Sequence, residues 1–444
     1  MFSRALLVVP VIPALSTVVG CEYVAQIGDK KAELGGRTDA GSADANAEGA
    51  DSDANDGATA GEGAAPSGTC LFDQALVPAT INYGSPTVLA RVSTPAGKRW
   101  ATMIGAPDRL VFNEVDDAGM LAHPQDVVLD QIAVQGDFLA PPRMVPLASG
   151  WLVAYGRYNA SPAQAVTTVR RFEPATAAFV GAEASGLVAT ATSLPRVTSA
   201  ALDDTGSRLL VPTILSSADL DPMRVELFNA TPERLRVDDT LPDSRGADCS
   251  WAPDAERFGM ATLTANGGAL QTFDRDMNQV ASFVFATPQL NPPWGAAEAP
   301  PAITSVGRQF YVAWVRLDSA AKSVVINGFD ALSGALRSPT SILVSSQPAT
   351  NAGYPAFPKL LIDGQTLLVT WIEMGTDFAG DIHAQRFDLD LSPVGEEMCV
   401  TCDTATRASG EYALAGDGAG RLAVEFYSTA NSRHYLVAIN CTTP

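Results

Sequence analysis

The ten residues RFDLDLSPVG, at positions 386–395, decide the fold of this chain. An apolar and polar alternation ends in the pair Phe387 and Asp388, and a short acidic stretch with a proline follows it. The pattern predicts a strand, an acidic turn and a returning strand. Its first half recurs along the chain.

The recurring feature is an aromatic residue followed by Asp, Asn or Glu, with one Ile and Asn pair ending the series. The pairs are Phe112 with Asn113, Phe172 with Glu173, Phe228 with Asn229, Phe273 with Asp274, Phe329 with Asp330, Phe387 with Asp388 and Ile439 with Asn440. They are 60, 56, 45, 56, 58 and 52 residues apart. A period of this length indicates one supersecondary unit repeated along the chain.

Two further markers share this period. An apolar run that predicts a buried strand precedes most of the pairs, at 151–155, 209–215, 310–315, 367–372 and 422–427. A proline precedes most of these runs, at Pro86, Pro142, Pro195, Pro301 and Pro355, with steps of 56, 53, 106 and 54 residues. The proline missing from the long step falls at Asp248, and a seventh is expected near Gly410.

Each unit is therefore expected to hold a Pro-led strand, an apolar strand, a strand ending in the aromatic and acid, and a final strand. Four antiparallel strands with their turns need about 40 to 55 residues, which is the length of one propeller blade. Seven units fill residues 70–444. The sequence predicts an all-β, seven-bladed β-propeller of four-stranded blades, with a pair of β-sandwich domains as the alternative.

The two ends of this region are expected to complete one blade together. Only Cys441 and three further residues follow Ile439 and Asn440, so the seventh unit lacks its fourth strand. Residues 70–83 precede the first Pro-led strand and hold enough apolar residues for one more strand. An N-terminal strand paired with the last C-terminal one closes the ring and leaves no exposed edge.

This closure predicts a disulfide between Cys70 and Cys441, which stand on either side of the interrupted turn. Cys399 and Cys402 are expected to form a local disulfide, although a C-x-x-C can also be a redox pair or half of a zinc site. Cys249 has no partner in this scheme and is expected to be a small buried apolar residue.

The first 21 residues have the layout of an export signal. Arg4 precedes an apolar run at 5–15, and small and apolar residues lead to Cys21. Two prolines break the run, so a membrane-spanning helix of about 20 residues fits poorly.

The segment Val18, Val19, Gly20 and Cys21 resembles the bacterial lipobox. The resemblance implies that Cys21 carries the lipid, including palmitate, and becomes the new N-terminus. It also implies an outer-membrane or cell-surface location, because Glu22 takes the place of the aspartate associated with inner-membrane retention. An ordinary secretory signal is the alternative.

A linker of 48 residues, 22–69, follows the signal. It contains ten acidic and three basic residues, and its second half has no aromatic or large aliphatic residue. Such a segment cannot form a core, so it is predicted to be a disordered acidic tether. Residues 70–444 form the predicted folded domain.

The composition excludes some functions. The 29 basic and 49 acidic residues give a formal charge of −20, which makes nucleic acid an unfavourable partner. Three widely separated histidines give no zinc-enzyme pattern, and no metal or cofactor is expected. The Asp-rich and Asn-rich turns are attributed to turn formation rather than to calcium binding.

A few residues are candidates for ligand binding. Arg143 and Arg196 follow the prolines of two inner strands and are expected to face the central channel together with Asp248. Sialidases, which are propellers, clamp a carboxylate with arginines, but their Ser-x-Asp-x-Gly-x-Thr-Trp repeat is absent from the seven turns. Trp294 and Tyr354 are expected at loop positions where an aromatic ring could contact a partner.

The expected function is that of a lipid-anchored, monomeric binding or scaffold module for a protein or glycan partner. The alternative is a glycan-cleaving or other hydrolase with its active site at the channel mouth. The sequence assigns no catalytic residue. A pocket of convergent acids and arginines would favour the enzyme, and a plugged apolar channel would favour the binding module.

Overall fold

The chain divides into two compact units, Met1–Gly63 and Ala64–Pro444, and the computed structural model describes most of the second. The described residues are 70–77, 86–94, 97–106, 108–116, 122, 127–132, 138–147, 149–160, 163–188, 195–214, 223–239, 241, 246–264, 267–286, 300–317, 321–338, 341–348, 354–375, 379–402, 406–410, 412–417, 420–428 and 430–441. The predicted signal peptide, Cys21 and the linker lie outside them. Within these ranges no helix combines the length and the apolar character that crossing a membrane requires.

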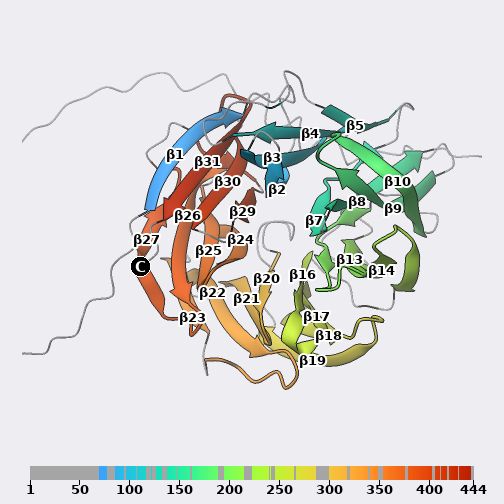
Figure 1. Cartoon of the computed structure of the whole chain (residues 1–444). Helices are drawn as coiled ribbons and strands as arrows, with labels where there is room; N and C mark the ends of the chain where they lie inside the picture. Colours follow the sequence, from blue (N-terminus) through green and yellow to red (C-terminus); the bar gives the residue numbers. More distant parts are fainter. Residues whose placement is uncertain are drawn as a thin grey trace, which may run out of the picture. The chain divides into compact units, whose positions relative to one another are not determined.

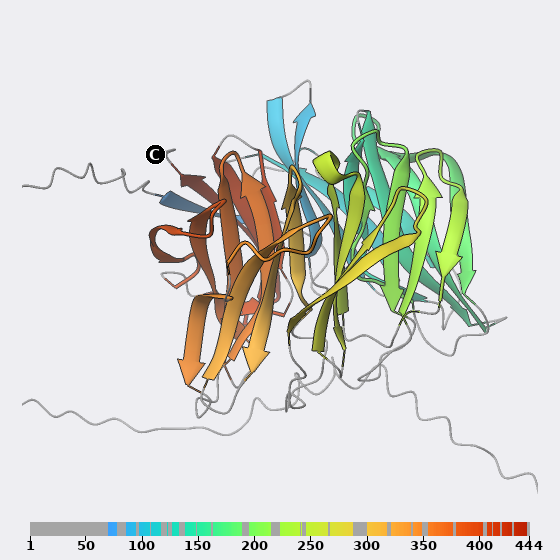
Figure 2. The same cartoon turned by 90° about the horizontal axis from the view of Figure 1, so that it is seen from below.

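Seven antiparallel sheets stand around one axis in the second unit, as Figures 1 and 2 show. Blade 1 comprises β2 (Pro86–Thr94), β3 (Gly97–Ala106), β4 (Arg109–Val115) and β5 (Val127–Gln131). Blade 2 comprises β6 (Phe138–Leu139), β7 (Arg143–Leu147), β8 (Gly150–Ala160), β9 (Ala163–Glu173) and β10 (Ala178–Val188). Blade 3 comprises β11 (Arg196–Val197), β12 (Ala201–Leu202), β13 (Arg208–Ile214), β14 (Met223–Asn229) and β15 (Arg234–Asp238).

The remaining four blades repeat this order. Blade 4 comprises β16 (Gly246–Ala252), β17 (Arg257–Thr264), β18 (Gly267–Phe273) and β19 (Gln279–Ala286). Blade 5 comprises β20 (Ala302–Val306), β21 (Gln309–Leu317), β22 (Ala321–Asp330) and β23 (Ile342–Pro348). Blade 6 comprises β24 (Tyr354–Asp363), β25 (Thr366–Met374), β26 (Ala379–Asp388), β27 (Pro393–Cys399) and β28 (Ala408–Ser409). Blade 7 comprises β29 (Ala413–Gly416), β30 (Arg421–Ser428), β31 (Arg433–Cys441) and β1 (Cys70–Val77).

This arrangement confirms the predicted all-β, seven-bladed propeller. The only helix among the described residues is the single 3-10 turn η1 (Pro253–Ala255) between β16 and β17. The first inner strand, β2, contacts the last one, β29, so the ring is complete. A pair of β-sandwiches is therefore excluded.

The hydrophobic core lies between the blades. Seven clusters of buried side chains each join two neighbouring blades, including one that joins blade 7 to blade 1. The seven apolar marker residues of the repeat belong to this core, because each is 2% exposed or less: Phe112, Phe172, Phe228, Phe273, Phe329, Phe387 and Ile439. Their regular spacing therefore reflects one packing position repeated in every blade.

The last blade is completed from the start of the folded domain, as predicted. Strand β1 pairs antiparallel with β31 over eight residue pairs, from Cys70 opposite Cys441 to Val77 opposite His434. The side chains of Cys70 and Cys441 lie outside the described part of the structure, so their disulfide stays a prediction. The backbone register places the two residues directly opposite each other.

The inner strands of blades 2 and 3 are divided, which the sequence did not predict. Strands β6 and β7 both pair with β8, and β11 and β12 both pair with β13. In blade 2 the interruption coincides with Pro141 and Pro142, and proline has no N–H to continue the ladder. The Pro142 and Thr198 carbonyl groups at these two breaks accept hydrogen bonds from Arg143.

Candidate functional site

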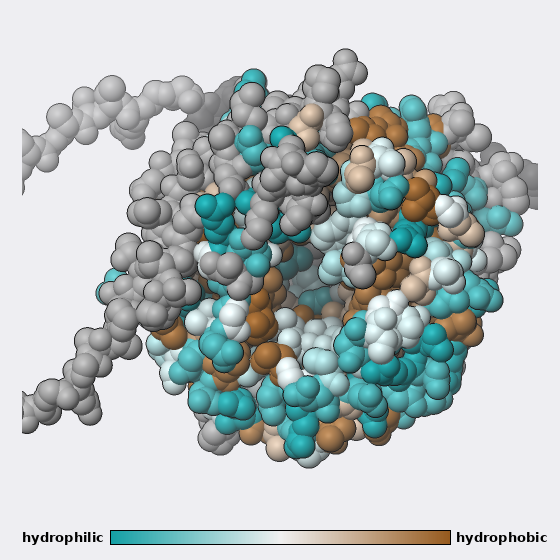
Figure 3. All heavy atoms as spheres, viewed as in Figure 1, coloured by the Kyte–Doolittle hydropathy of each residue, from teal (hydrophilic) through white to brown (hydrophobic). Residues whose placement is uncertain are grey.

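A cavity of about 240 Å³ occupies the axis of the propeller, and the space-filling view shows this face hollowed at its centre (Figure 3). Its walls come mostly from the inner strands of blades 1, 2, 3, 4, 6 and 7, and Pro300 and Pro301 line it just before β20 of blade 5. The described residues that line it are Leu89, Arg143, Met144, Arg196, Thr198, Ser199, Ala200, Ile214, Gly246, Ala247, Asp248, Pro300, Pro301, Pro358, Lys359, Leu360, Tyr412, Ala413 and Leu414.

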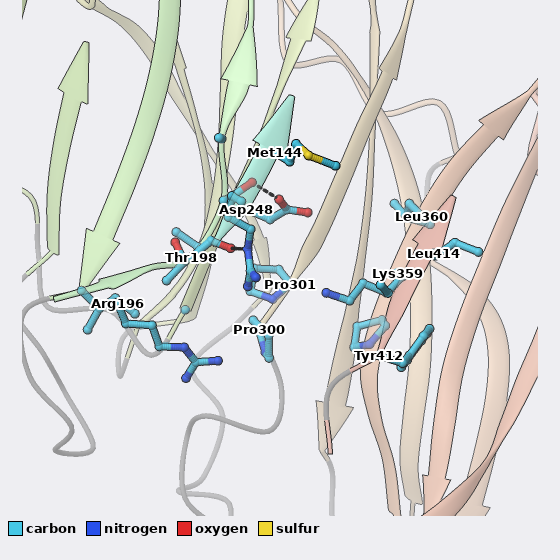
Figure 4. Close-up of a pocket in the computed structure, with 18 of the residues that line it drawn as sticks. Met144, Arg196, Thr198, Asp248, Pro300, Pro301, Lys359, Leu360, Tyr412 and Leu414 are labelled. Carbon is cyan, nitrogen blue, oxygen red and sulfur yellow. Dashed lines mark hydrogen bonds between the residues drawn. The ribbon is translucent and has the colours of Figure 1, made fainter. Parts of the chain in front are cut away.

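Four of these described lining residues are charged, and three of the four are cations. Arg143 comes from β7, Arg196 from β11 and Lys359 from β24, whereas Asp248 comes from β16. Arg196 and Lys359 approach from opposite sides, and Lys359 extends toward the wall that holds Asp248 and Pro301 (Figure 4). The cavity is therefore cationic in a chain whose formal charge is −20.

Asp248 is fixed by three hydrogen bonds. Ser199 donates its hydroxyl to Oδ1 at 2.5 Å, the Cys249 N–H donates to the same oxygen at 2.9 Å, and the Ile303 N–H donates to Oδ2 at 2.9 Å. These donors belong to blades 3, 4 and 5, so one carboxyl group joins three blades. Burial raises the pKa of Asp248, although these bonds and the charge of Lys359 act in the opposite direction.

Arg143 connects blades 2 and 3. Its Nε donates to the carbonyl oxygen of Thr198 at 2.8 Å, and its Nη1 donates to that of Pro142 at 3.2 Å. The backbone break between β11 and β12 makes the Thr198 carbonyl accessible to this contact. Arg143 thus has a structural role as well as a charge at the cavity wall.

The wall formed by β24 and β29 is apolar apart from Lys359. Leu360 and Leu414 line it beside Tyr412, whose hydroxyl lies 2.6 Å from Thr370 Oγ1. The tyrosine is 1% exposed, so it closes the wall rather than projecting into the opening. A ligand in the cavity meets cations on some sides and apolar groups on another.

These groups support binding more readily than hydrolysis. A glycosidase uses two carboxyl groups, and Asp248 is the single acid among the described residues that line the cavity. Ser199 is bonded to Asp248, but no histidine accompanies it in that described lining, so a Ser and His pair is lacking there. The described lining of the cavity therefore has the arginines expected of an enzyme but a single acid instead of several. It is also not the plugged apolar channel expected of a binding module.

The structure places the other candidate residues away from the cavity or does not describe them. Tyr354 begins β24, is 4% exposed and packs in the core between blades 6 and 7, so it is not the exposed loop-edge ring that the sequence suggested. Trp294 and His123 lie outside the described residues. Cys249 is buried and free, as expected, while Cys399 and Cys402 form the predicted local disulfide.

Sequence reasoning missed the partners of Asp248. Ser199 and the Ile303 amide lie 49 and 55 residues away in the chain, in neighbouring blades. The spacing of about one repeat was the only signal available, because it places the three residues in or beside the inner strands of successive blades.

No family model matches the sequence, and neither does any curated protein. Among solved structures, a putative 6-phosphogluconolactonase from Bacteroides uniformis is 16% identical, with a TM-score of 0.44 over 70% of this chain and 85% of that one. The Dos1 propeller is 12% identical, with a TM-score of 0.43 over 79% and 81%. The β-propeller domain of the trilobed protease from Pyrococcus furiosus is 9% identical, with a TM-score of 0.43 over 81% and 94%. Likenesses this distant carry no argument about activity, and the fold stands on the strand topology.

Proposed function

We propose that this chain is an exported, lipid-anchored and monomeric propeller that binds an acidic glycan at the outer membrane or cell surface. The observation that carries the proposal is the convergence of Arg143, Arg196 and Lys359 on one axial cavity. Cations that converge from separate rigid strands recognise an anion at little cost in ordering, because the sheet has already fixed their positions.

The size of the cavity favours the terminal sugar of a glycan over a whole oligosaccharide. Pockets for drug-sized molecules measure about 300–1,000 Å³, whereas this cavity measures about 240 Å³. A single acidic sugar matches the mixed lining, since its carboxylate suits the cations and its C–H faces suit Leu360 and Leu414. The rest of the glycan would then extend along the propeller surface.

The test is calorimetric titration of the detergent-solubilised full chain with glucuronate, with glucose and inorganic phosphate as comparison ligands. We expect glucuronate to bind and glucose not to bind. Arg196→Gln and Lys359→Gln should each weaken binding about 10- to 100-fold, because a hydrogen bond to a charged group is worth about 1.5–3 kcal/mol. Arg433→Gln, which removes an exposed cation from β31, is the matched control and should change nothing.

Two results would overturn the proposal. Equal affinity for glucuronate and glucose would show that the cations do not select the ligand. Tighter binding of phosphate than of glucuronate, with the same sensitivity to the two variants, would replace the sugar acid with a phosphate group.

The lipid anchor is tested separately. Export of the full chain in cells supplied with labelled palmitate should label the wild type and leave Cys21→Ser unlabelled. A labelled Cys21→Ser chain, or an unlabelled wild type, would contradict the anchor and leave the cavity proposal standing.

The hydrolase alternative has one specific observation in its favour, which is the raised pKa of Asp248. A carboxyl group whose pKa is raised by its surroundings is a candidate general acid. Release of sugar from aryl glucuronides by the wild type, abolished in Asp248→Asn, would favour hydrolysis. Binding without turnover would favour the module.

A further inference from the structure

A cluster of metal-ligating side chains lies on blade 6, outside the axial cavity. Strands β27 and β28 both pair with β26, and the turn that leaves β27 carries Cys399 and Cys402. The pairing of β26 with β27 places His383 directly opposite Cys399. The sequence alone gave this C-x-x-C no histidine, because His383 lies 16 residues earlier.

One imidazole is common to two groups of possible ligands. A ring nitrogen of His383 and the sulfurs of Cys399 and Cys402 lie within 4.8 Å of one another, and the same limit holds for His383, Glu373 and Glu397. The ring stacks on Trp371 with centroids 5.7 Å apart, which restricts its orientation. Both groups therefore surround a side chain that is already positioned.

The two ring nitrogens have different environments. Nδ1 lies 2.8 Å from Oε1 of Glu397, a hydrogen-bond distance, and Nε2 lies 3.9 Å from Oε2 of Glu373. Metal-bound histidines commonly donate the other N–H to a carboxylate, as His383 can to Glu397. The 3.9 Å gap is too long for a hydrogen bond, so Glu397 and not Glu373 is the hydrogen-bonding carboxylate of this ring.

The cysteine turn is held in place without its disulfide. The Val400 N–H donates to the Ile382 carbonyl at 2.7 Å, and the Ile382 N–H donates to Thr401 Oγ1 at 2.9 Å. Both side chains of the turn are buried, Thr401 completely. Reduction of the disulfide should therefore leave both sulfurs beside His383.

The turn also fixes the position of one sulfur. The Cys402 N–H donates to Cys399 Sγ at 3.1 Å. Two thiolates and an imidazole are donors that suit Zn²⁺, which also accepts a solvent molecule as its fourth ligand.

We propose that reduction of the Cys399–Cys402 bond creates a site for a zinc-class divalent ion, with Cys399, Cys402 and His383 as ligands and solvent in the fourth position. A dithiol reductant supplies two electrons and two protons and is itself oxidised to a disulfide. The two thiols then lose their protons to solvent as the metal binds. The disulfide and the metal are thus alternative states of one corner of blade 6, and Glu397 is a positioning residue for His383.

The test uses the full chain reduced with a phosphine, freed of reductant without air and titrated with Co²⁺. We expect one equivalent to bind with a thiolate-to-cobalt charge-transfer band in the near ultraviolet. The unreduced chain should bind at least 100-fold more weakly. Equal binding before and after reduction would overturn the redox dependence, and absence of the band would overturn the site.

Variants separate this site from the remaining cysteines. The Cys399→Ser and Cys402→Ser double variant should lose the band, and persistence of the band would assign it to other sulfurs and overturn the proposal. Glu397→Gln should weaken Co²⁺ binding about 10- to 100-fold, and its neighbour Glu396→Gln is the matched control and should not. His383→Ala should keep its thermal unfolding midpoint and lose affinity by a similar or greater factor. Unchanged affinity in a folded His383→Ala would remove His383 from the ligand set.

Discussion

Glu425 is a buried carboxyl group whose ionisation affects the stability of the fold. It lies on β30, is fully buried where blade 7 meets blade 1, and accepts a hydrogen bond from Thr102 of β3. His434 Nδ1 lies 3.6 Å from its Oε1 and is equally buried. Burial raises the pKa of Glu425 to about 8, although the Thr102 bond acts in the opposite direction. The carboxyl group therefore holds its proton more tightly in the folded chain than in the unfolded one.

This raised pKa predicts a stability that falls as the pH rises from about 4.5 to about 8. In that window the folded state binds more protons than the unfolded state, so this group lowers the free energy of unfolding by up to about 1.4 kcal/mol per pH unit. Glu425→Gln keeps the size of the side chain and an acceptor for Thr102, and should flatten this dependence. Urea unfolding of both proteins at several pH values across the window measures it. If the free energy of unfolding of the wild type varied with pH as little as that of the variant, the raised pKa of Glu425 would be contradicted.

At the scale of the element, the aromatic and acid pair has a physical explanation. In the turn after Phe273, the N–H groups of Asp276 and Asn278 donate to Asp274 Oδ1 at 3.0 and 2.8 Å. In blade 6 the N–H groups of Asp390 and Ser392 donate to Asp388 Oδ1 at 2.9 and 2.8 Å. The aromatic residue fills the core, and the acid that follows it satisfies the backbone of the turn.

Replacing an acid of this turn should lower the free energy of unfolding only if its carboxylate accepts hydrogen bonds from the backbone of the turn. Asp274→Ala loses two backbone hydrogen bonds, so we expect the free energy of unfolding to fall by about 1–2 kcal/mol. Asp276→Ala, in the same turn and more exposed, should change it by less than about 0.5 kcal/mol. Denaturant unfolding compares them, and equal effects would show that the turn does not depend on the Asp274 carboxylate.

Blades 2 and 3 approach each other closely at a glycine. A Cβ atom at Gly156 in β8 would lie 1.6 Å from the carbonyl oxygen of Pro195, so only glycine lets blades 2 and 3 come together there. Gly156→Ala should therefore lower the free energy of unfolding by more than about 2 kcal/mol. Gly181→Ala is the control, since its Cβ meets nothing within 4 Å and its cost is the strain of φ +74°, about 1 kcal/mol. If Gly156→Ala were no less stable than the control, the approach of the two blades would be wrong.

For the whole molecule, the closure of the ring depends on residues at its two chain ends. The pairing of β1 with β31 places Cys70 opposite Cys441, and a disulfide there would close a loop of about 370 residues. In the chain-entropy model such a bond contributes about 6 kcal/mol.

Cys441→Ser should therefore lower the free energy of unfolding by a few kcal/mol while leaving the propeller folded. Peptide mapping under non-reducing conditions should recover the peptides of Cys70 and Cys441 as one linked species. A free thiol at Cys70 in the exported protein would contradict the disulfide, although not the pairing of the two strands.

The sequence was informative where one physical requirement repeats in every blade. The buried aromatic, the turn acid and the proline before the inner strand recur at one period, so the number of blades and the closure by β1 followed from counting. The contacts of Asp248 join different blades and those of His383 join strands within blade 6, and the repeat alone does not show which side chains meet. Tyr354 was expected at a loop edge because it precedes Pro355. Its pairing with Met374 of β25 makes it the first residue of β24, and a single sequence does not show this pairing.

The contrast between the cavity and the rest of the molecule is also a property of the whole. A chain with a formal charge of −20 repels anions in general, yet three cations from blades 2, 3 and 6 face one axial space. The positive charge of the cavity therefore favours an anionic ligand inside it, although the rest of the chain repels anions.

The most direct test of the central claim is a crystal structure of the full chain with glucuronate. We predict that the sugar occupies the axial cavity with its carboxylate among Arg143, Arg196 and Lys359, and that Asp248 keeps its bonds to Ser199 and Ile303. Glucuronate bound at another surface, with the axial cavity holding only solvent, would contradict the account.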